Sequence, residues 1–306
     1  TPKPSSAASD VYKRQAQGKV VVVAGFQGLS TTNEITTLGR GGSDTTAVAI
    51  AAALGADSCE IYTDVTGVFS ADPRIVPQAR KLARISFDEM LEMAGAGSKV
   101  LALRSVEFAR NHQVPLHVRS SFTWEQGTWV TAEEPSVEEP IISGIVHDVN
   151  ESKVTVQSVP DQPGIAFALF EPLAAANVNV DMIVQNTSID GKTDISFTVP
   201  KAELKVALEI VGSVAKNIGA AGVTHQTDIA KVSLVGAGMK TSPGIAAKMF
   251  RVLSEEKINI EMISTSTIRI SVVVSAAATE RACQVLHSAF GLDSGQAYSA
   301  PLPDRK

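Results

Sequence analysis

Short apolar runs alternate with longer stretches of helical spacing along the first half of the chain. The predicted strands are 19–24, 58–63 and 115–119. The predicted helices are 43–54, 86–94 and 99–111, the first capped by Ser43 or Asp44. Such alternation is typical of a parallel sheet covered by helices, in which ligands bind beyond the carboxyl ends of the strands.

The second half contains an internal repeat. Pro163-Gly164-Ile165-Ala166 recurs as Pro243-Gly244-Ile245-Ala246, and Asn179 and Met182 recur as Asn259 and Met262. Each copy predicts the strand and helix order of a ferredoxin-like βαββαβ unit. The sequence leaves open whether a further strand at 141–147 belongs to the first copy or completes the second.

Two segments lack any apolar period. Residues 1–17 predict a disordered arm or a foreign junction, and the acidic, proline-containing segment 131–140 predicts a linker. An acidic surface loop within one domain is the alternative for the second segment. The expected division is 1–18 arm, 19–130 α/β domain, 131–140 linker, 141–230 first repeat, and 231–306 second repeat with a tail.

Composition narrows the class of protein. The chain has 306 residues, 44% of them hydrophobic and 19% charged, with a net charge of −5, which excludes wholesale disorder and a basic nucleic-acid surface. The longest apolar stretch, 47–56, is too short to span a membrane. Cys59 and Cys283 form no disulfide framework, which fits a reducing cytoplasm, and the histidines show no zinc-ligand spacing.

Two glycine-containing loops follow predicted strands. The first runs from Gly25 to Asp44 and offers Arg40 and a helix start, and the second runs from Thr63 to Arg74. Because glycine lets a ligand approach the backbone and helix starts attract anions, the loops predict a site for phosphates and a carboxylate. Two ordinary turns with a surface salt bridge are the alternative. Within the first repeat, the Asp161–Gly164 turn and Asp181 predict a pocket for a small amino acid. The alternative is that Pro163 only favours the helix start and Gly164 only serves packing.

Several motifs closely resemble aspartokinases of the amino-acid kinase family. They are GFQG, TTLGRGGSDTTA at 36–47, TDVTGVFSADPR at 63–74 and GSKVLALRS at 97–105. The repeat resembles the tandem ACT domains of that family, with NVNVDMIVQN at 177–186 and INIEMISTS at 258–266 as effector-binding strands. The implied fold is part of an amino-acid-kinase α/β sheet domain followed by two α+β ferredoxin-like ACT domains.

The resemblance implies transfer of the ATP γ-phosphoryl group to the side-chain carboxylate of L-aspartate. This is the first step towards lysine, threonine, methionine and diaminopimelate. Arg40, Gly41, Gly42 and Ser43 would bind aspartate, and Asp44 would be the catalytic residue that orients the lysines around the phosphoryl group. ATP would arrive with Mg, with no tightly bound cofactor and no resident metal. The implied ATP-site residues are Thr63, Asp64, Phe69, Ser70, Ala71, Asp72, Pro73, Arg74, Lys99 and Val100.

The resemblance also implies feedback inhibition by lysine, threonine or both, in a homo- or hetero-oligomer. The implied effector residues of the first repeat are Asp161, Gly164, Ile165, Ala166, Asn179, Val180, Asp181 and Gln185. Those of the second are Ile245, Ala246, Asn259, Ile260 and Ser266. Because the second copy has no acid equivalent to Asp161, the two pockets should prefer different ligands.

One departure from the family pattern affects the expected activity. No Lys-Phe/Tyr-Gly-Gly phosphate loop precedes Val20, so the sequence predicts a chain truncated at its N-terminus and unable to catalyse phosphoryl transfer efficiently. A non-catalytic amino-acid-sensing subunit is the alternative. A kinase acting on glutamate, acetylglutamate or a nucleoside monophosphate fits less well, because such enzymes do not usually carry tandem repeats of this kind.

Overall fold

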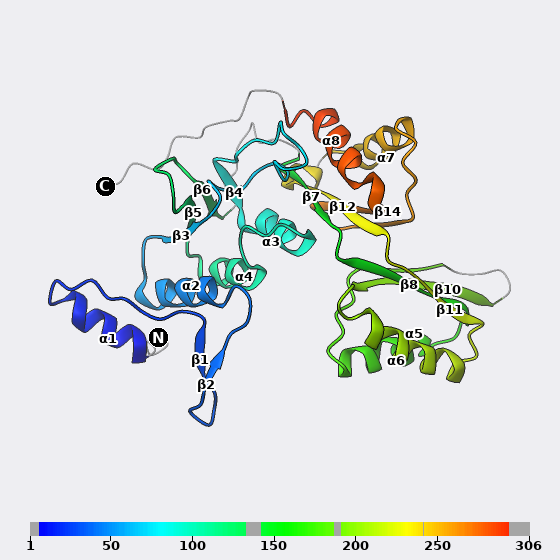
Figure 1. Cartoon of the computed structure of the whole chain (residues 1–306), viewed down its shortest axis with the longest axis horizontal. Helices are drawn as coiled ribbons and strands as arrows, with labels where there is room; N and C mark the ends of the chain where they lie inside the picture. Colours follow the sequence, from blue (N-terminus) through cyan, green and yellow to red (C-terminus); the bar gives the residue numbers. More distant parts are fainter. Residues whose placement is uncertain (1–5, 133–141, 187–190, 241, 294–306) are drawn as a thin grey trace. The chain divides into compact units, whose positions relative to one another are not determined.

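The computed structural model describes residues 6–132, 142–186, 191–240 and 242–293, which fall into two compact units (Figure 1). Unit 1 spans Thr1–Val146, Val235–Ser242 and His287–Lys306, and unit 2 spans His147–Leu234 and Pro243–Leu286. Of the predicted linker, residues 133–140 lie outside the described part of the chain.

Unit 1 is a mixed α/β unit. Its sheet has the order β3-β5-β6-β4, in which β3 pairs with β5 and β4 with β6 in parallel, while β5 and β6 are antiparallel. The expected α/β fold is therefore confirmed, with one antiparallel pair in the sheet. The elements are α1 (Ser6–Gln15), β1 (Gln27–Leu29), β2 (Ile35–Thr37), α2 (Gly42–Leu54), β3 (Cys59–Thr63), β4 (Arg84–Ser86), α3 (Phe87–Ala96), α4 (Leu103–His112), β5 (Leu116–Ser120), β6 (Thr128–Thr131) and the 3-10 helix η1 (Ala237–Lys240).

The helices of unit 1 begin for different local reasons. Ser86 caps α3 in a capping box with Glu89, which satisfies backbone groups at the helix start. In contrast, α2 begins after Gly41, whose φ of 75° is left-handed, and not at the predicted caps Ser43 or Asp44. A Cβ on Gly41 would lie 2.2 Å from the Cβ of Ala102, so close packing at this point requires glycine.

Three predictions for unit 1 were wrong. Residues 19–24 form no strand, and Val20 is 94% exposed, because a β-branched run becomes a strand only beside a pairing partner. Residues 6–15 form the helix α1, whose Val11 is buried and whose Tyr12 hydroxyl donates to the Leu54 carbonyl at 2.6 Å. The helix predicted at 99–111 begins only at Leu103.

Unit 2 contains the repeat, and each copy shows the ferredoxin-like pattern. The first copy forms a complete βαββαβ sheet with the order β11-β8-β10-β9. The two antiparallel pairings of β10, with β8 and with β9, make β8 and β9 run in the same direction. The elements are β8 (Glu151–Pro160), α5 (Ile165–Ala175), β9 (Ile183–Gln185), β10 (Lys192–Pro200), α6 (Leu204–Asn217) and β11 (Gly222–Gln226).

The second copy borrows a strand that precedes the first copy in sequence. Its sheet has the order β13-β14-β12-β7, so the strand predicted near 141–147 completes the second copy. The elements are β7 (Gly144–Asp148), β12 (Ile229–Val235), α7 (Ile245–Glu255), β13 (Met262–Thr265), β14 (Arg269–Ser275), the 3-10 helix η2 (Ala276–Ala278) and α8 (Thr279–Ala289).

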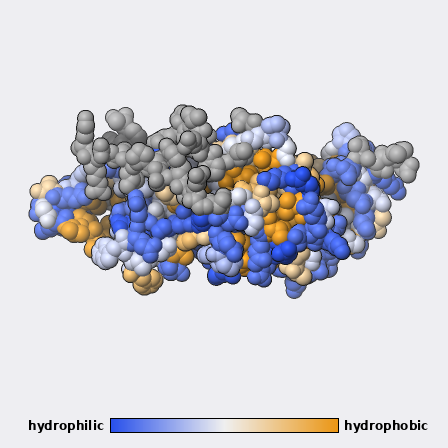
Figure 2. Space-filling model, turned by 90° about the horizontal axis from the view of Figure 1, so that it is seen from above, coloured by the Kyte–Doolittle hydropathy of each residue, from blue (hydrophilic) through white to orange (hydrophobic). Residues whose placement is uncertain are grey.

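Apolar residues spaced along the helices and strands form the cores. In the first repeat, α5 and α6 cover one face of the sheet (Figure 1), and Leu169, Leu173, Phe197 and Val211 are fully buried between them. The face seen in Figure 2 is mostly hydrophilic, with smaller hydrophobic patches. No helix in the described residues is long and apolar enough to cross a membrane.

Candidate functional site

Two helix starts and two strand ends meet at one edge of unit 1. A short turn at Gly55 joins α2 to β3, and another at Gln113 joins α4 to β5. Because each helix packs on the strand that follows it, the N-terminus of the helix lies near the carboxyl end of the strand. A hydrogen bond from the Ser121 N–H to the Thr63 carbonyl, at 2.7 Å, links the two strand ends.

The two helix starts touch each other. Gly41 packs against Ala102, the residue before α4, and the Asp44 carboxylate accepts a hydrogen bond from the Ala102 backbone. Burial raises the pKa of Asp44, and this hydrogen bond offsets part of the rise. The structure thus brings the predicted aspartate-binding turn beside the segment that contains Lys99 and Val100.

This edge is suited to bind anions. The start of α2 has no side-chain cap, so the N–H groups of Ser43 and Asp44 point out of the helix without an intrahelical acceptor. The nearby cations Arg40, Lys99 and Arg104 are exposed, and none has a hydrogen-bond or ion-pair partner among the residues that the structure describes. Unpaired cations beside free helix N–H groups favour a phosphate or carboxylate ligand.

The second predicted loop divides into an exposed and a buried part. Thr63 donates to the Asp64 carboxylate at 3.1 Å, and the Arg74 guanidinium forms an ion pair with Asp72 at 2.6 Å. In contrast, Ser70 and Ala71 are only 2% and 5% exposed, so these two residues pack in the interior and support the loop from the protein side. The exposed residue Pro73 and the half-buried residues Phe69 and Asp72 remain on its open side. A cavity shared with the Arg40–Asp44 turn stays a prediction.

The sequence analysis assigned no role to two residues of unit 1 that the structure makes prominent. Arg104 lies in the GSKVLALRS motif, so its position was available as a signal, although the contact of Ala102 in the same motif with Gly41 was not. Glu89 was overlooked as a residue of an ordinary helix. Its carboxylate accepts hydrogen bonds from the Ser143 hydroxyl and the Ala237 N–H as well as from Ser86. Glu89 therefore fixes α3 to two distant segments of the chain.

The predicted effector residues of the first repeat fall at opposite ends of α5. Gly164, with a φ of 94°, starts the helix, whereas Asn179 follows its end. An eleven-residue helix is about 16 Å long, so the two positions are far apart. Because β9 runs in the direction of β8, Gln185 lies at the Gly164 end. Asp161, Ile165 and Ala166 share that end, whereas Val180 and Asp181 lie near Asn179. One repeat alone thus forms no single pocket from these residues.

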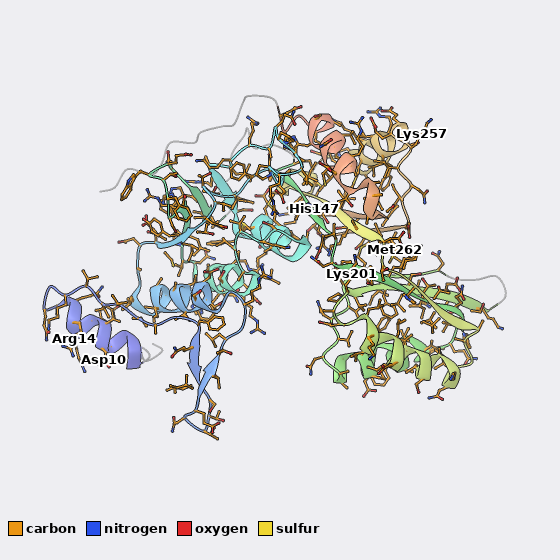
Figure 3. The ribbon with its side chains drawn as sticks, in the orientation of Figure 1. Asp10, Arg14, His147, Lys201, Lys257 and Met262 are labelled. Carbon is orange, nitrogen blue, oxygen red and sulfur yellow. The ribbon has the colours of Figure 1, made fainter. Side chains whose placement is uncertain are left out.

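The two repeats are joined by reciprocal ion pairs. Lys153 of the first pairs with Glu261 of the second at 2.9 Å, and the equivalent Lys231 of the second pairs with Asp181 of the first. Met182 and the equivalent Met262 share a small buried apolar cluster beside them (Met262 is labelled in Figure 3). Asp181 is therefore already bound to a lysine of the chain, which does not fit its predicted role as ligand of an effector ammonium group.

A hollow lies in the second repeat at the end of α7. It has a volume of about 400 Å³ and is lined by Phe250, Ser254, Lys257, Ile258, Asn259 and Ile260. Lys257, labelled in Figure 3, follows the last turn of the helix. Of the predicted effector residues of this repeat, Asn259 and Ile260 line the hollow, whereas Ile245, Ala246 and Ser266 are not part of it. An effector site here stays a prediction.

An α/β unit with an edge suited to anions, combined with duplicated ferredoxin-like modules, is the architecture expected of small-molecule kinases that carry paired regulatory domains. Sequence comparison gives the same class. The model of the amino acid kinase family matches residues 6–120, and that of the ACT domain matches residues 154–213 and 232–290. The first match includes part of the segment that was expected to be a disordered or foreign arm.

The chain belongs to the aspartokinase family. It is 56% identical over 279 residues to an aspartokinase of Pseudomonas aeruginosa, and the aligned region covers 90% of this chain and 68% of that protein. It is 53% identical over 281 residues to an aspartokinase of Mycobacterium tuberculosis, and here the aligned region covers 90% of this chain and 67% of that protein. Members of this family are phosphotransferases.

Solved structures of aspartate kinases superpose on most of this chain. Aspartate kinase of Clostridium acetobutylicum superposes with a TM-score of 0.81 at 25% identity, covering 94% of this chain and 67% of that one. Aspartokinase III of E. coli in complex with aspartate and ADP superposes with a TM-score of 0.77 at 28% identity, covering 94% and 65%. The same enzyme with lysine and aspartate gives a TM-score of 0.73 at 29% identity, covering 94% and 64%.

Proposed function

We propose that the protein transfers the γ-phosphoryl group of Mg·ATP to the side-chain carboxylate of L-aspartate. This reaction opens the synthesis of lysine, threonine, methionine and diaminopimelate. The observation that carries the proposal is the edge where the starts of α2 and α4 meet. Arg40, Lys99 and Arg104 are exposed beside it and have no partner among the described residues. Both substrates are anions, and phosphoryl transfer depends mainly on positioning and charge neutralisation.

In this proposal the start of α2 binds aspartate. Arg40 offers a planar fork to one carboxylate, Gly41 and Gly42 let that carboxylate approach the backbone closely, and the free Ser43 N–H can donate to it. Asp44 receives the Ala102 N–H, and its charge orients the cations around the transferred group. Asp44 is not required as a base, because the nucleophilic carboxylate carries no proton at neutral pH.

The nucleotide binds at the adjacent strand end. Thr63 and Asp64 stand at the carboxyl end of β3, and the loop of residues 69–74 follows them. Lys99 and Val100, just before α4, complete the site from the other side. The magnesium ion enters as part of the nucleotide substrate and neutralises phosphate oxygens there.

Binding measurements on the chain test this assignment. Titration calorimetry should detect binding of Mg·ADP and of L-aspartate. Arg40→Ala should weaken aspartate binding about tenfold or more, because a charge-assisted hydrogen bond to the carboxylate is lost. Arg110→Ala is the matched control, because Arg110 lies at the far end of α4, in an ion pair with Asp88 at 2.9 Å. Unchanged aspartate affinity in Arg40→Ala, or no binding by the parent chain, would contradict the proposal.

We further propose that the repeats bind lysine, threonine or both and thereby inhibit the kinase. The hollow beside Asn259 supports a ligand site in the second repeat. The separation of Gly164 from Asn179 supports a site completed by residues of another chain, so we propose an oligomer formed through the ACT domains. Inhibition requires that the effector binds one arrangement of the protein more tightly than another.

Calorimetry with each amino acid, alone and combined, tests the regulatory part. Asn259→Ala should lower the affinity of the second-repeat site, whereas Asn217→Ala, at the end of α6, should leave it unchanged. Absence of heat with lysine, threonine and their mixture would refute it. Analytical ultracentrifugation at several concentrations would show whether the chain associates.

A further inference from the structure

One buried hydrogen bond links the loop at residues 69–74 to the end of α8. The Ser70 hydroxyl lies 2.9 Å from Nε2 of His287, and the two residues are 2% and 0% exposed. They are 217 positions apart in sequence. A side-chain contact that spans this separation and excludes water holds its two segments in one arrangement.

Ser70 is also held by its backbone and by its neighbours. Its N–H donates to the Arg80 carbonyl at 2.8 Å, its hydroxyl accepts the Arg80 N–H at 2.9 Å, and its carbonyl accepts the Ile145 N–H at 2.7 Å. The Arg80 guanidinium in turn donates to the carbonyl of Leu292 at 2.9 Å, five residues after His287. Ser70 and Arg80 together form an anchor for the loop. The segment from His287 to Leu292, which ends α8 and continues beyond it, contacts this anchor twice, once at Ser70 and once at Arg80.

The buried anchor residue Ser70 is followed almost directly in sequence by the exposed part of the loop. Ala71 is buried next to Ser70, and Asp72 then accepts the backbone N–H groups of Ile75 and Val76 at 3.1 and 2.9 Å. The Asp72 carboxylate holds Arg74. A displacement of Ser70 would consequently move the residues that face the proposed nucleotide.

We propose that His287 is a positioning residue for the nucleotide-binding loop and acts on it through Ser70. His287, at the end of α8 and within unit 1, thereby forms part of the support of the nucleotide site. This inference rests on the proposed function only in taking residues 69–74 as the loop that binds Mg·ATP.

The imidazole is suited to hold one position. Burial lowers the pKa of His287, with Arg80 lowering it further and Asp293 raising it. The ring is thus kept neutral near pH 7. In the neutral ring, Nε2 and the Ser70 hydroxyl form one hydrogen bond, and the tautomer of the ring decides which of them donates. Nδ1 has no partner among the described residues, so Ser70 provides the only described hydrogen bond of the ring.

Hydrogen exchange and nucleotide binding, measured on the whole chain, test the inference together. His287→Leu should speed amide exchange of residues 69–76 about tenfold and weaken Mg·ADP binding about tenfold, as expected for one lost buried hydrogen bond. His287→Gln retains a polar group that can reach Ser70 and should restore both values to within about threefold. His225→Leu, on the exposed strand β11, should change neither.

The outcomes separate the two hypotheses. If exchange and affinity in His287→Leu equal those of the parent chain, the inference is wrong. It is also wrong if exchange rises while affinity is unchanged, because the loop would then move without consequence for the nucleotide. If the parent chain binds no Mg·ADP, the proposed function fails, and the exchange of residues 69–76 still decides whether His287 holds the loop. Should His287→Leu not fold, Ser70→Ala breaks the same bond from the other side.

Discussion

Replacement of Lys231 by methionine tests what holds the two repeats together. Lys231 is 1% exposed, pairs with Asp181 and lies 3.7 Å from Glu151. Methionine fills a similar volume but carries no charge. The variant therefore leaves two carboxylates without a cation, and only 9% of the Glu151 side chain is exposed to water.

The expected cost follows from burial. Removal of one partner from a buried ion pair costs about 3–5 kcal/mol of unfolding free energy. Burial raises the pKa of Glu151 and the Lys231 charge lowers it, so without lysine this carboxyl is expected to take up a proton more readily. The equivalent Lys153 provides an internal comparison, because Lys153 and Glu261 are 18% and 20% exposed. Lys153→Met should cost only about 1 kcal/mol, because solvent screens this pair.

The positions of the tryptophans give a selective assay. The chain has two, Trp124 and Trp129, and both lie in unit 1, so their fluorescence follows unit 1 while far-UV circular dichroism follows both units. In urea, Lys231→Met should shift the dichroism transition to lower concentration and leave the fluorescence transition nearly in place. A loss of less than about 1 kcal/mol for Lys231→Met, or equal losses in the two variants, would refute the argument from burial.

Three further predictions concern unit 1, each measured by urea unfolding with tryptophan fluorescence. Because burial lowers the pKa of His287, the unfolded chain takes up the proton first, so stability should fall as the pH drops through about 6.5. Between about pH 7.5 and about pH 5.5, His287→Gln should lose up to about 1.4 kcal/mol less unfolding free energy than the parent chain. An equal loss in the variant and the parent chain would count against this. Glu89→Gln should cost about 2 kcal/mol, because an amide offers only one acceptor oxygen to the donors around it; a neutral result would mean that these hydrogen bonds are not formed. Gly41→Ala should cost well over the roughly 1 kcal/mol expected of Gly39→Ala, since both have positive φ but only Gly41 packs against another residue, and equal costs would show that the contact relaxes.

Features set by local sequence were predictable. The repeat fixed the order of strands and helices in each copy, and the apolar spacing located α2, α3, β3 and β5 to within a few residues. The glycine-rich turn predicted an anion site, and the family resemblance implied that the motif around Lys99 belongs to the ATP site. The structure places both segments at adjacent helix starts.

Features set by partners distant in sequence were not predictable. The run at 19–24 has strand propensity but no pairing strand in the described structure. Asp181 suited an ammonium ligand until its partner proved to be Lys231 of the other repeat. The sequence analysis placed Ser70 in a ligand-binding loop, because nothing in the spacing of the chain indicates a contact with His287. In each case tertiary contact overrode the local preference.

The strand β7 makes the regulatory region a nested structure in sequence. The whole first repeat is inserted between β7 and β12, two neighbouring strands of the second sheet. During synthesis the first repeat can consequently fold as soon as β11 has emerged, whereas the second must wait for its remaining strands while β7 stays unpaired. A fragment that starts after Asp148 would keep the first module whole and leave the second with an open edge.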